Sequence, residues 1–529
     1  MAVFVAGIAG IIVFYLLVLA VGIWAGSRRK GDGDDDFILA GRSIGLYIGL
    51  ITFIATYVGG GYINATTEAM FDTGLAWCQV PFGYGLSLIL GALLFVRPMR
   101  AAQYVTMLDP LQQRFGSRVG GLLYIPALCG DLFWVGAILN ALGSSLEVIL
   151  GLDRVTSVTV SAVFAAAYTM VGGLLSVTYT DVLQLIFIVF GLVLSAPFAY
   201  SHPAVDHSAV ASADWLGSLK QEDIGEWTDL LLMMIFGGLS WQGYFQRVLS
   251  VKTTCAAQTL SLGSVVGCML LAIPPAFIGI IARATDWQAV EDVARNITSV
   301  DKELVLPLVL RYLTPSWVAF FGLGAISASI MASADSSILA SSSMFSRNIY
   351  KLVLRTQASE REMVWVLRVS VVVITAIAAL IGLTAGSIYY LSVLCSDLVY
   401  VVLFPQLFLA VHCPRLVNKH GSVAAFVVGI VLRLLCGEHG LGLPAALHLP
   451  GFEAETGRQR FPFRTLTMLA AAATLLVVSA AARLRRPSAG FADAAALKPP
   501  PPGAPAADKL GLDNPAAADV LASEKTSRL

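Results

Sequence analysis

The chain has 529 residues, of which 57% are hydrophobic and 13% are charged, and its mean hydropathy is +0.77. A soluble protein could not bury so much apolar surface, so the composition predicts a protein that crosses a membrane many times. The formal net charge is zero, which excludes a general basic surface for nucleic acid. Seven scattered cysteines predict neither a disulfide framework nor a cysteine metal site.

Apolar stretches long enough to cross a bilayer recur along the whole sequence. The first is followed by Arg28, Arg29 and Lys30 and has no basic residue before it, which predicts a retained helix rather than a cleaved signal peptide. Further Lys and Arg residues gather in alternate loops, which places those loops in the cytosol and the N-terminus outside. The thirteen expected spans are 5–26, 44–72, 76–96, 120–150, 155–173, 177–200, 227–250, 256–282, 316–346, 363–384, 387–411, 422–436 and 465–483.

Two of these spans contain glycine clusters with aromatic neighbours at the expected depth of the membrane centre. One cluster is Gly59-Gly60-Gly61 and the other is Gly237-Gly238. Close helix packing is one role for such glycines. However, a pair of interrupted spans is typical of the binding site of a secondary transporter, and unwound carbonyls are oxygen ligands suited to Na⁺. The sequence therefore predicts two helices broken at these glycines.

The two clusters lie in the second and seventh spans, so equivalent points are separated by an odd number of spans. The two copies would then have opposite orientations, which predicts an all-α membrane protein built as an inverted repeat of five plus five helices. The expected organisation is a first helix with a cytosolic loop (1–43), a first repeat (44–200), an extracellular loop (201–226), a second repeat (227–411), two final helices (412–486) and a disordered cytosolic tail (487–529).

Two short motifs lie outside the spans. Asn296-Ile297-Thr298 is a glycosylation acceptor in a loop that the predicted topology places outside. The last four residues, Thr526-Ser527-Arg528-Leu529, resemble a ligand of a PDZ-type domain. An ordinary disordered tail is the alternative interpretation of this terminus.

Carboxylates and hydroxyls within the spans are candidate cation ligands, because a charge in a membrane helix needs water, a cation or a partner. Asp335 lies among the serines of the ninth span. Of these serines, Ser333 and Ser336 are the candidate cation ligands beside it. Asp181 lies near the cytosolic end of the sixth span, where it either guards ion exit or caps a helix. For Asp131 and Asp397, the sequence does not separate a structural role from a functional one.

Aromatic residues crowd the same spans. Such rings often mark the membrane interface, but rings beside a helix break face the cavity that the break creates. Several ring faces around one pocket suit a quaternary ammonium ion, which is held by cation–π attraction. On this basis the residues indicate an apolar or cationic solute. The rings are Tyr57, Tyr62, Tyr84, Phe133, Trp134, Trp241 and Tyr244.

Several motifs resemble a known family. Gly172-Gly173-Leu174 followed by Thr180-Asp181 and Gln184 is similar to the signature of the sodium:solute symporter family. Five longer stretches resemble its choline-transporting branch, and the similarity runs from about Ile11 to Met468. These stretches are GGGYIN, YVTMLDP, GGLSWQGYFQRVLS, FGLGAISASIMASADSSILASSSMFSRNIY and CSDLVYVVLFPQL.

The resemblance implies the leucine-transporter fold and an uptake of choline that is coupled to Na⁺ and depends on Cl⁻. It also implies a multi-pass protein of the plasma membrane, at presynaptic terminals and in synaptic vesicles, that supplies acetylcholine synthesis; a homo-oligomer is a further expectation. By motif match, the residues implied at the common sodium site are Ala55, Val58, Ser329 and Ser333. Those implied at a second sodium site are Asp181, Asp335 and Ser336. Those implied around choline are Tyr84, Trp134 and Trp241, with Tyr57 at a fourth ring position.

Three positions depart from the pattern of that branch. Tyr57 stands in place of a tryptophan, Ala332 in place of a serine at the common sodium site, and Ser392 in place of an aromatic residue. These departures favour an alternative, a sodium symporter of the same family for another small organic solute. A solute sensor or channel without coupled transport is the third hypothesis. No nucleophile–base pair or metal-ligand set stands out, which argues against an enzyme.

Overall fold

The computed structural model describes residues 5–26, 38–171, 174–212, 214–290, 293, 297–298, 301–384 and 386–485. The glycosylation acceptor Asn296, the signature glycines Gly172 and Gly173, and the tail with its PDZ-type ending lie outside these ranges. Contacts group Met1–Ala482 into one unit, which holds the candidate site described below.

Long apolar segments form the helices of the first half, because a helix satisfies its own backbone N–H and C=O groups where water is absent. Pro81, in the first turn of α5, and the left-handed Gly151 after α9 mark a helix start and a helix end. The helices are α1 (Val5–Gly26), α3 (Leu46–Tyr57), α4 (Gly60–Asp72), α5 (Val80–Leu94), α6 (Val96–Ala101), α7 (Asp109–Phe115), α8 (Ser117–Leu122), α9 (Tyr124–Leu150), α10 (Arg154–Val171), α11 (Leu174–Tyr200) and α12 (His207–Ala211).

The second half continues the pattern, with side-chain caps where helices start at a loop. Thr253, Ser387 and Asn418 each accept a backbone N–H from the first turn of the helix that follows. The helices are α13 (Ile224–Leu239), α14 (Gln242–Ser250), α15 (Thr254–Arg283), α16 (Val305–Tyr312), α17 (Ser316–Met344), α18 (Glu360–Thr384), α19 (Ile388–Leu394), α20 (Phe404–His412), α21 (Lys419–Leu435) and α22 (Phe463–Arg485).

Shorter elements join these helices. Two π-helical segments, Phe345–Leu354 and Val399–Leu403, follow α17 and precede α20. Strands β1 (Phe452–Glu453) and β2 (Arg458–Gln459) form a small antiparallel hairpin before α22. The 3₁₀ turns are Ala40–Arg42, Leu75–Trp77, Asp214–Leu216, Gln221–Asp223, Trp287–Ala289, Lys302–Leu304, Pro414–Leu416 and His439–Leu441.

Within the described ranges, nine helical stretches are long and apolar enough to cross a bilayer, and the bent pair α3–α4 makes up to ten. The remaining expected spans fall on α10, on α13 with α14, and on α21, which are shorter or interrupted. The multi-span character is therefore confirmed, and the count of thirteen stays a prediction.

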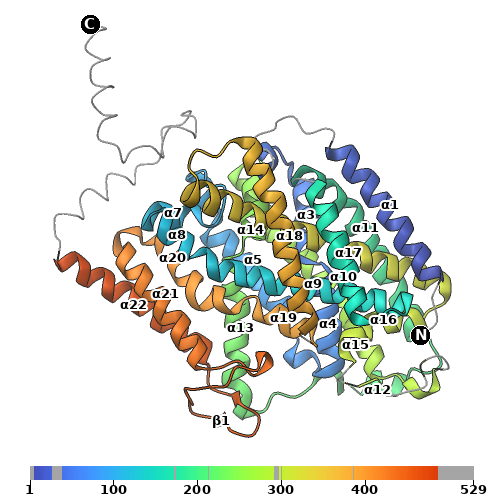
Figure 1. Ribbon diagram of the computed structural model, residues 1–529. Helices are drawn as coiled ribbons and strands as arrows, with labels where there is room; N and C mark the ends of the chain where they lie inside the picture. The colour runs from blue at the N-terminus through green and yellow to red at the C-terminus, as the bar shows by residue number, and fades with distance from the viewer. Residues whose placement is uncertain are drawn as a thin grey trace. The chain divides into compact units, whose positions relative to one another are not determined.

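Helix α17 is the most enclosed long helix of the bundle. It packs against α11, α1, α9 and α3, and it also contacts α4 and α14 (Figure 1). From Ala325 to Met344 every side chain of α17 is buried, including its serines and Asp335. Since polar side chains buried in this way must face protein partners or bound ions, α17 is the natural helix to carry ligands.

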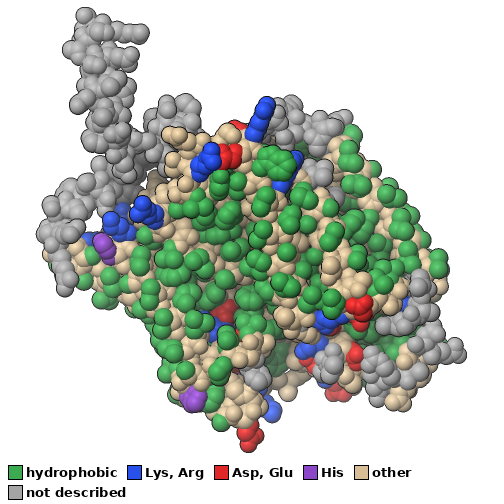
Figure 2. Space-filling view, viewed as in Figure 1, with side chains coloured by type: hydrophobic (Ala, Val, Ile, Leu, Met, Phe, Trp, Pro, Cys, Tyr) green, Lys and Arg blue, Asp and Glu red, His purple; other side chains and the backbone are tan. Residues whose placement is uncertain are grey.

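The surface has the composition expected of a membrane protein. Apolar side chains cover most of the face shown in Figure 2, and charged side chains gather mainly toward opposite edges. Large residues such as Phe190 and Val193 on α11, and Val373 and Leu380 on α18, are more than a third exposed. In water such a surface would be unfavourable, so it indicates contact with lipid.

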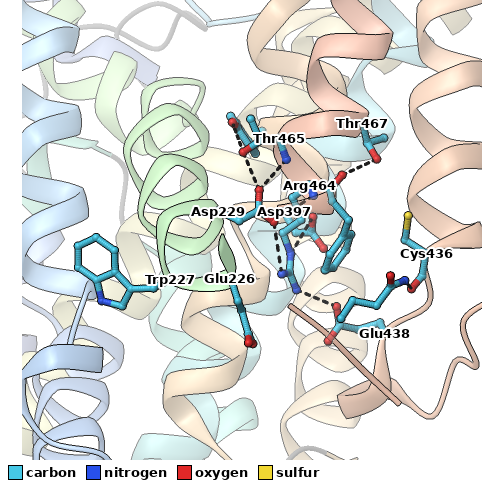
Figure 3. Close-up of polar contacts among 12 residues, drawn as sticks. Glu226, Trp227, Asp229, Asp397, Cys436, Glu438, Arg464, Thr465 and Thr467 are labelled. Carbon is cyan, nitrogen blue, oxygen red and sulfur yellow. Dashed lines mark hydrogen bonds and ion pairs between the residues drawn. The ribbon is translucent and has the colours of Figure 1, made fainter. Parts of the chain in front are cut away.

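The last two helices attach to the bundle through buried charges. Asp229 of α13 accepts the backbone N–H groups of Arg464 and Thr465 at 3.0 and 2.7 Å, and the Arg464 guanidinium is 3.1 Å from Glu438 (Figure 3). Asp397 joins the same cluster.

Asp397 accepts a hydrogen bond from Nε of Arg433 on α21 at 2.7 Å. Both side chains are at least 95% buried. This pairing assigns Asp397 a structural role, which the sequence alone did not settle.

Candidate functional site

The first predicted break is present in the structure. Helix α3 ends at Tyr57 and α4 starts at Gly60, with a bend of 49° between them. Val58 lies outside helical geometry and Gly59 is extended, with φ −97° and ψ −171°. The carbonyls of the last turn of α3 therefore lack the partners that a continuous helix would provide.

The glycines at this break let α17 approach the unwound backbone closely. A Cβ atom on Gly59 would lie 2.1 Å from Cβ of Ser333, and one on Gly60 would lie 2.2 Å from Cγ1 of Ile330. Any larger residue would push the two helices apart. The glycines thus serve close approach as well as unwinding.

The second break is also present, but three residues later than predicted. Helix α13 ends at Leu239 and α14 starts at Gln242, so the non-helical residues are Ser240 and Trp241. The prediction that Gly237 and Gly238 form the break is wrong, because both lie inside α13.

Their role is close packing. A Cβ on Gly237 would lie 2.5 Å from the carbonyl oxygen of Ser396, and one on Gly238 would lie 2.9 Å from Oγ of Ser87. The packing role that the sequence left open for such glycines applies here.

Four rings meet between the two breaks. The centroid distances are 6.2 Å for Tyr57–Tyr84, 6.0 Å for Tyr84–Trp134, 6.0 Å for Trp134–Trp241 and 5.1 Å for Trp241–Tyr57. Each ring plane is inclined by 74–88° to the next, as adjacent walls of a box are. The four predicted substrate-binding residues therefore lie together, and each ring contacts the next around a closed loop. We call these four rings the ring box.

The size of the ring box suits a cation. A charge at the centre of a circuit with sides of this length would lie roughly 4 Å from each centroid, within the range of cation–π attraction of about 6 Å. The surrounding cavity is also lined by Gly237, Gly238, Ser240, Gln242 and Asp131.

Other rings that the sequence grouped here do not line the cavity. The Tyr62 hydroxyl donates to the carbonyl of Cys268 at 3.0 Å, and the Tyr244 hydroxyl is 3.2 Å from Oγ of Ser261. Both side chains are fully buried by helix packing. Phe133 likewise packs against the hydrophobic core.

The residues implied at the common sodium site gather at the first break. The Ser329 hydroxyl donates to the carbonyl of Val58 at 3.2 Å, and N–H of Gly60 donates to Oγ of Ser333 at 3.2 Å. Ala55 belongs to the last turn of α3 and is fully buried. Carbonyl and hydroxyl oxygens from α3 and α17 thus converge, and such oxygens are the ligands that a hard cation prefers.

The residues implied at the second sodium site also come together, but around an arginine. Nη2 of Arg247 on α14 lies 2.9 Å from Oδ2 of Asp181 and 2.7 Å from Oγ of Ser336. Asp335 accepts the backbone N–H of Ser336 at 2.7 Å and interacts electrostatically with Arg247. Two carboxylates facing one guanidinium leave one excess negative charge when both are ionised.

Arg247 was not predicted as a site residue, although a basic residue in a buried membrane segment is a signal of function. Three threonines of this cluster were also missed. Thr52 donates to Asp181, while Thr56 and Thr178 accept from Nε and Nη1 of Arg247 at 3.1 and 3.3 Å. Hydroxyls with local backbone partners are common in membrane helices, so nothing in the sequence separated these from the rest.

The other departures from the family pattern lie close by. Ala332 is buried on α17, between Ser329 and Ser333 in the chain. Ser392 is buried on α19, and its carbonyl accepts a hydrogen bond from the Tyr84 hydroxyl at 3.1 Å. The backbone of α19 at Ser392 therefore helps to position the Tyr84 ring.

Two helix breaks beside a buried, ring-lined cavity define a membrane transporter for a small solute. Residues 37–429 match the model of the sodium:solute symporter family, and the chain belongs to this family. It is a transporter rather than an enzyme.

The curated relatives of the chain include named choline transporters. The high-affinity choline transporter 1 of Drosophila melanogaster is 51% identical over 468 residues, which cover 88% of this chain and 76% of the relative. The high-affinity choline transporter 1 of Homo sapiens is 48% identical over 488 residues, which cover 89% of this chain and 84% of the relative.

Solved structures with the same fold are sodium- or cation-coupled symporters. A Na⁺-coupled sialic acid symporter in a substrate-bound, outward-open state matches with a TM-score of 0.74 at 16% identity, covering 90% of this chain and 97% of that chain. A nucleobase-cation symporter in a closed conformation matches with a TM-score of 0.51 at 12% identity, covering 87% and 98%. The leucine-transporter-like fold with two broken helices is thereby confirmed.

Proposed function

We propose that this protein takes up choline together with Na⁺ by alternating access. The ring box carries the proposal, because several aromatic rings around one pocket can hold a quaternary ammonium ion without needing hydrogen bonds from it. Relatives of nearly half-identical sequence that are named choline transporters support the same substrate.

Three neutral polar groups in the cavity suit the hydroxyl of choline. The side-chain atoms Oη of Tyr57, Oγ of Ser240 and Nε2 of Gln242 are buried without a hydrogen-bond partner among the described residues. Buried polar atoms favour a ligand that completes their hydrogen bonds. At the position where the choline-transporting branch carries tryptophan, Tyr57 thus offers both a ring face and a hydroxyl group.

The coupling ion would bind at two places. The oxygens of Ala55, Val58, Ser329 and Ser333 connect the first break to α17, and Na⁺ there would hold α3 against α17. Asp181, Asp335 and Ser336 form the second place, where Na⁺ would neutralise the excess negative charge beside Arg247. An inside-negative potential drives each positive charge inward by about 2.3 kcal/mol per 100 mV.

Alternating access needs a contact that closes one side. Glu68 of α4 accepts the backbone N–H groups of Ile388 and Tyr389, at 2.9 and 3.0 Å, and lies 3.7 Å from Nζ of Lys302. This contact joins α4 to the start of α19 on the side that the Lys and Arg pattern places outside. We infer that it closes the outer side while the solute leaves toward the cytosol.

Finer features belong to the same proposal. A requirement for Cl⁻ and a location in the plasma membrane of presynaptic terminals and in synaptic vesicles are supported by the family resemblance alone, and a homo-oligomer is proposed with them. The PDZ-type partner is supported by the last four residues, the glycosylation at Asn296 by its acceptor motif, and the domain limits given above by the order of the spans. Among the described residues no group is assigned to Cl⁻.

Uptake of labelled choline into cells or proteoliposomes, with Na⁺ or with K⁺ outside, tests the proposed function. We expect Na⁺-dependent accumulation that unlabelled choline suppresses. Accumulation of a different solute with no competition from choline would favour the second hypothesis. Large currents without accumulation would favour a channel or sensor.

Asp335→Asn tests the second sodium place. Removing this carboxylate takes away the excess negative charge, so the Na⁺ concentration for half-maximal uptake should rise roughly tenfold, which is about 1.4 kcal/mol. The measurement is a Na⁺ titration of choline uptake at saturating choline. Asp214→Asn, the same change in an exposed loop, is the control. An unaltered titration for Asp335→Asn would contradict the ligand role.

A further inference from the structure

One carboxylate in the cavity wall, Asp131, has no Lys or Arg partner among the residues that the structure describes. Asp131 of α9 lines the cavity, is 2% exposed, and its Oδ2 has no hydrogen-bond partner among the described residues. Ser341 lies near this carboxylate, but the two do not meet the geometry of a hydrogen bond. An unpaired carboxylate at this depth is costly unless a cation approaches it.

The position of Asp131 is fixed relative to the ring box. Its other oxygen, Oδ1, accepts a hydrogen bond from Nε1 of Trp241 at 3.1 Å. Trp134 follows three residues later on α9, so both side chains lie on the same face of that helix. Nε1 of Trp134 is held in turn by Oγ of Ser337 at 3.1 Å. The free Oδ2 is therefore presented beside the rings by a rigid frame.

Other buried carboxylates of the described chain differ from Asp131. Asp181 pairs with Arg247, Asp397 with Arg433, and Glu68 with Lys302. Each of these three carboxylates has a cationic partner inside the protein. Asp335 also has an oxygen without a hydrogen-bond partner, but it interacts electrostatically with Arg247 and does not line the cavity. Asp131 has no Lys or Arg partner within the described ranges, and it faces the cavity instead.

We propose that Asp131 supplies the counter-charge for the cationic solute in the ring box. The inference rests on the proposed function and deepens it, because it assigns the preference for a cation over a neutral molecule of the same shape to a single residue. Ring faces favour a cation by a modest amount each, whereas a desolvated carboxylate discriminates strongly between charged and neutral ligands. The hydrogen bond to Trp241 places this counter-charge at the second helix break, so solute binding stabilises that region.

A neutral isostere of choline provides the test. In 3,3-dimethylbutan-1-ol a carbon atom replaces the nitrogen, so shape and hydroxyl stay while the charge is lost. For purified wild-type protein, choline should protect against thermal unfolding at far lower concentrations than the alcohol does. In Asp131→Asn, whose amide oxygen can still accept from Trp241, we expect the choline affinity to fall at least tenfold. The affinity for the alcohol should stay unchanged or rise.

Two further variants make the result unambiguous. Asp131→Glu keeps the charge but changes the shape of the side chain, and it should keep most of the preference for choline over the alcohol. If the shape of the side chain set this preference, Asp131→Glu would lose it. Asp214→Asn is the matched control and should behave as wild type. If Asp131→Asn does not fold, Asp131→Ser carries the same comparison.

The inference and the proposed function fail in different ways. Wild-type protein that neither binds nor transports choline would overturn the proposed function. An unchanged ratio of choline to alcohol affinity in Asp131→Asn or Asp131→Ser, with choline binding intact in the wild type, would overturn the counter-charge alone.

Discussion

Trp241→Ala should raise the apparent KM for choline by roughly 30-fold, because a desolvated cation–π contact contributes about 2 kcal/mol and 1.4 kcal/mol corresponds to a factor of ten. Trp241 joins the ring box to the second helix break. It contacts Tyr57 and Trp134, and its Nε1 holds Asp131. Initial rates of labelled choline uptake at increasing concentrations, normalised to the protein at the cell surface, give the KM.

Two controls separate the ring from its surroundings. Trp24 on α1 is 46% exposed and meets the edge of Tyr179, so Trp24→Ala should leave KM near the wild-type value. Trp241→Phe keeps a ring face but removes the N–H that Asp131 accepts, and it should give an intermediate KM. A Trp241→Ala protein with wild-type KM would remove Trp241 from the binding site.

The ring box could be predicted only in part from the sequence. Tyr57 and Trp241 flank the breaks, and their positions alone point to a cavity. Tyr84 and Trp134 lie on α5 and α9, and their place beside the cavity came from the family resemblance rather than from spacing. Tyr62 and Tyr244 also lie near breaks, yet they point into helix contacts. Sequence position does not give the direction of a side chain around a broken helix, since helical periodicity is lost there.

The place of the second break shows a similar limit. Gly237-Gly238 looks like the weakest point of the segment by helix propensity. The helix nevertheless continues through both glycines, because Ser396 and Ser87 from neighbouring segments pack directly against them. The break falls at Ser240 and Trp241, two residues without a strong breaking tendency. Tertiary packing, which the sequence does not show, decides between a glycine that unwinds a helix and one that admits a neighbour.

From the sequence, the carboxylates and hydroxyls of the charged cluster beside α17 were predicted, but their partner Arg247 was not. Asp181 and Asp335 were expected to meet Na⁺ alone, whereas Arg247 occupies part of that space. The residue lies 66 positions from Asp181 in the chain, so no local pattern connects them. Na⁺ at this place would therefore bind next to the fixed positive charge of Arg247.

Arg247→Met should destabilise the folded protein by about 3–5 kcal/mol, because it leaves the fully buried Asp181 without its partner. Asp181→Asn should also destabilise the folded protein, because the Arg247 guanidinium then stays buried without the Asp181 carboxylate beside it. The double variant Arg247→Met/Asp181→Asn should be more stable than the sum of the single effects, because neither uncompensated charge remains. Thermal unfolding of the purified proteins in detergent gives the comparison, with the exposed Lys252→Met as control.

Strictly additive losses would mean that the two side chains do not form an energetically coupled pair. If the double variant folds well but no longer takes up choline with Na⁺, the Arg247–Asp181 pair serves ion coupling beyond stability, because its loss then impairs transport while the fold is retained.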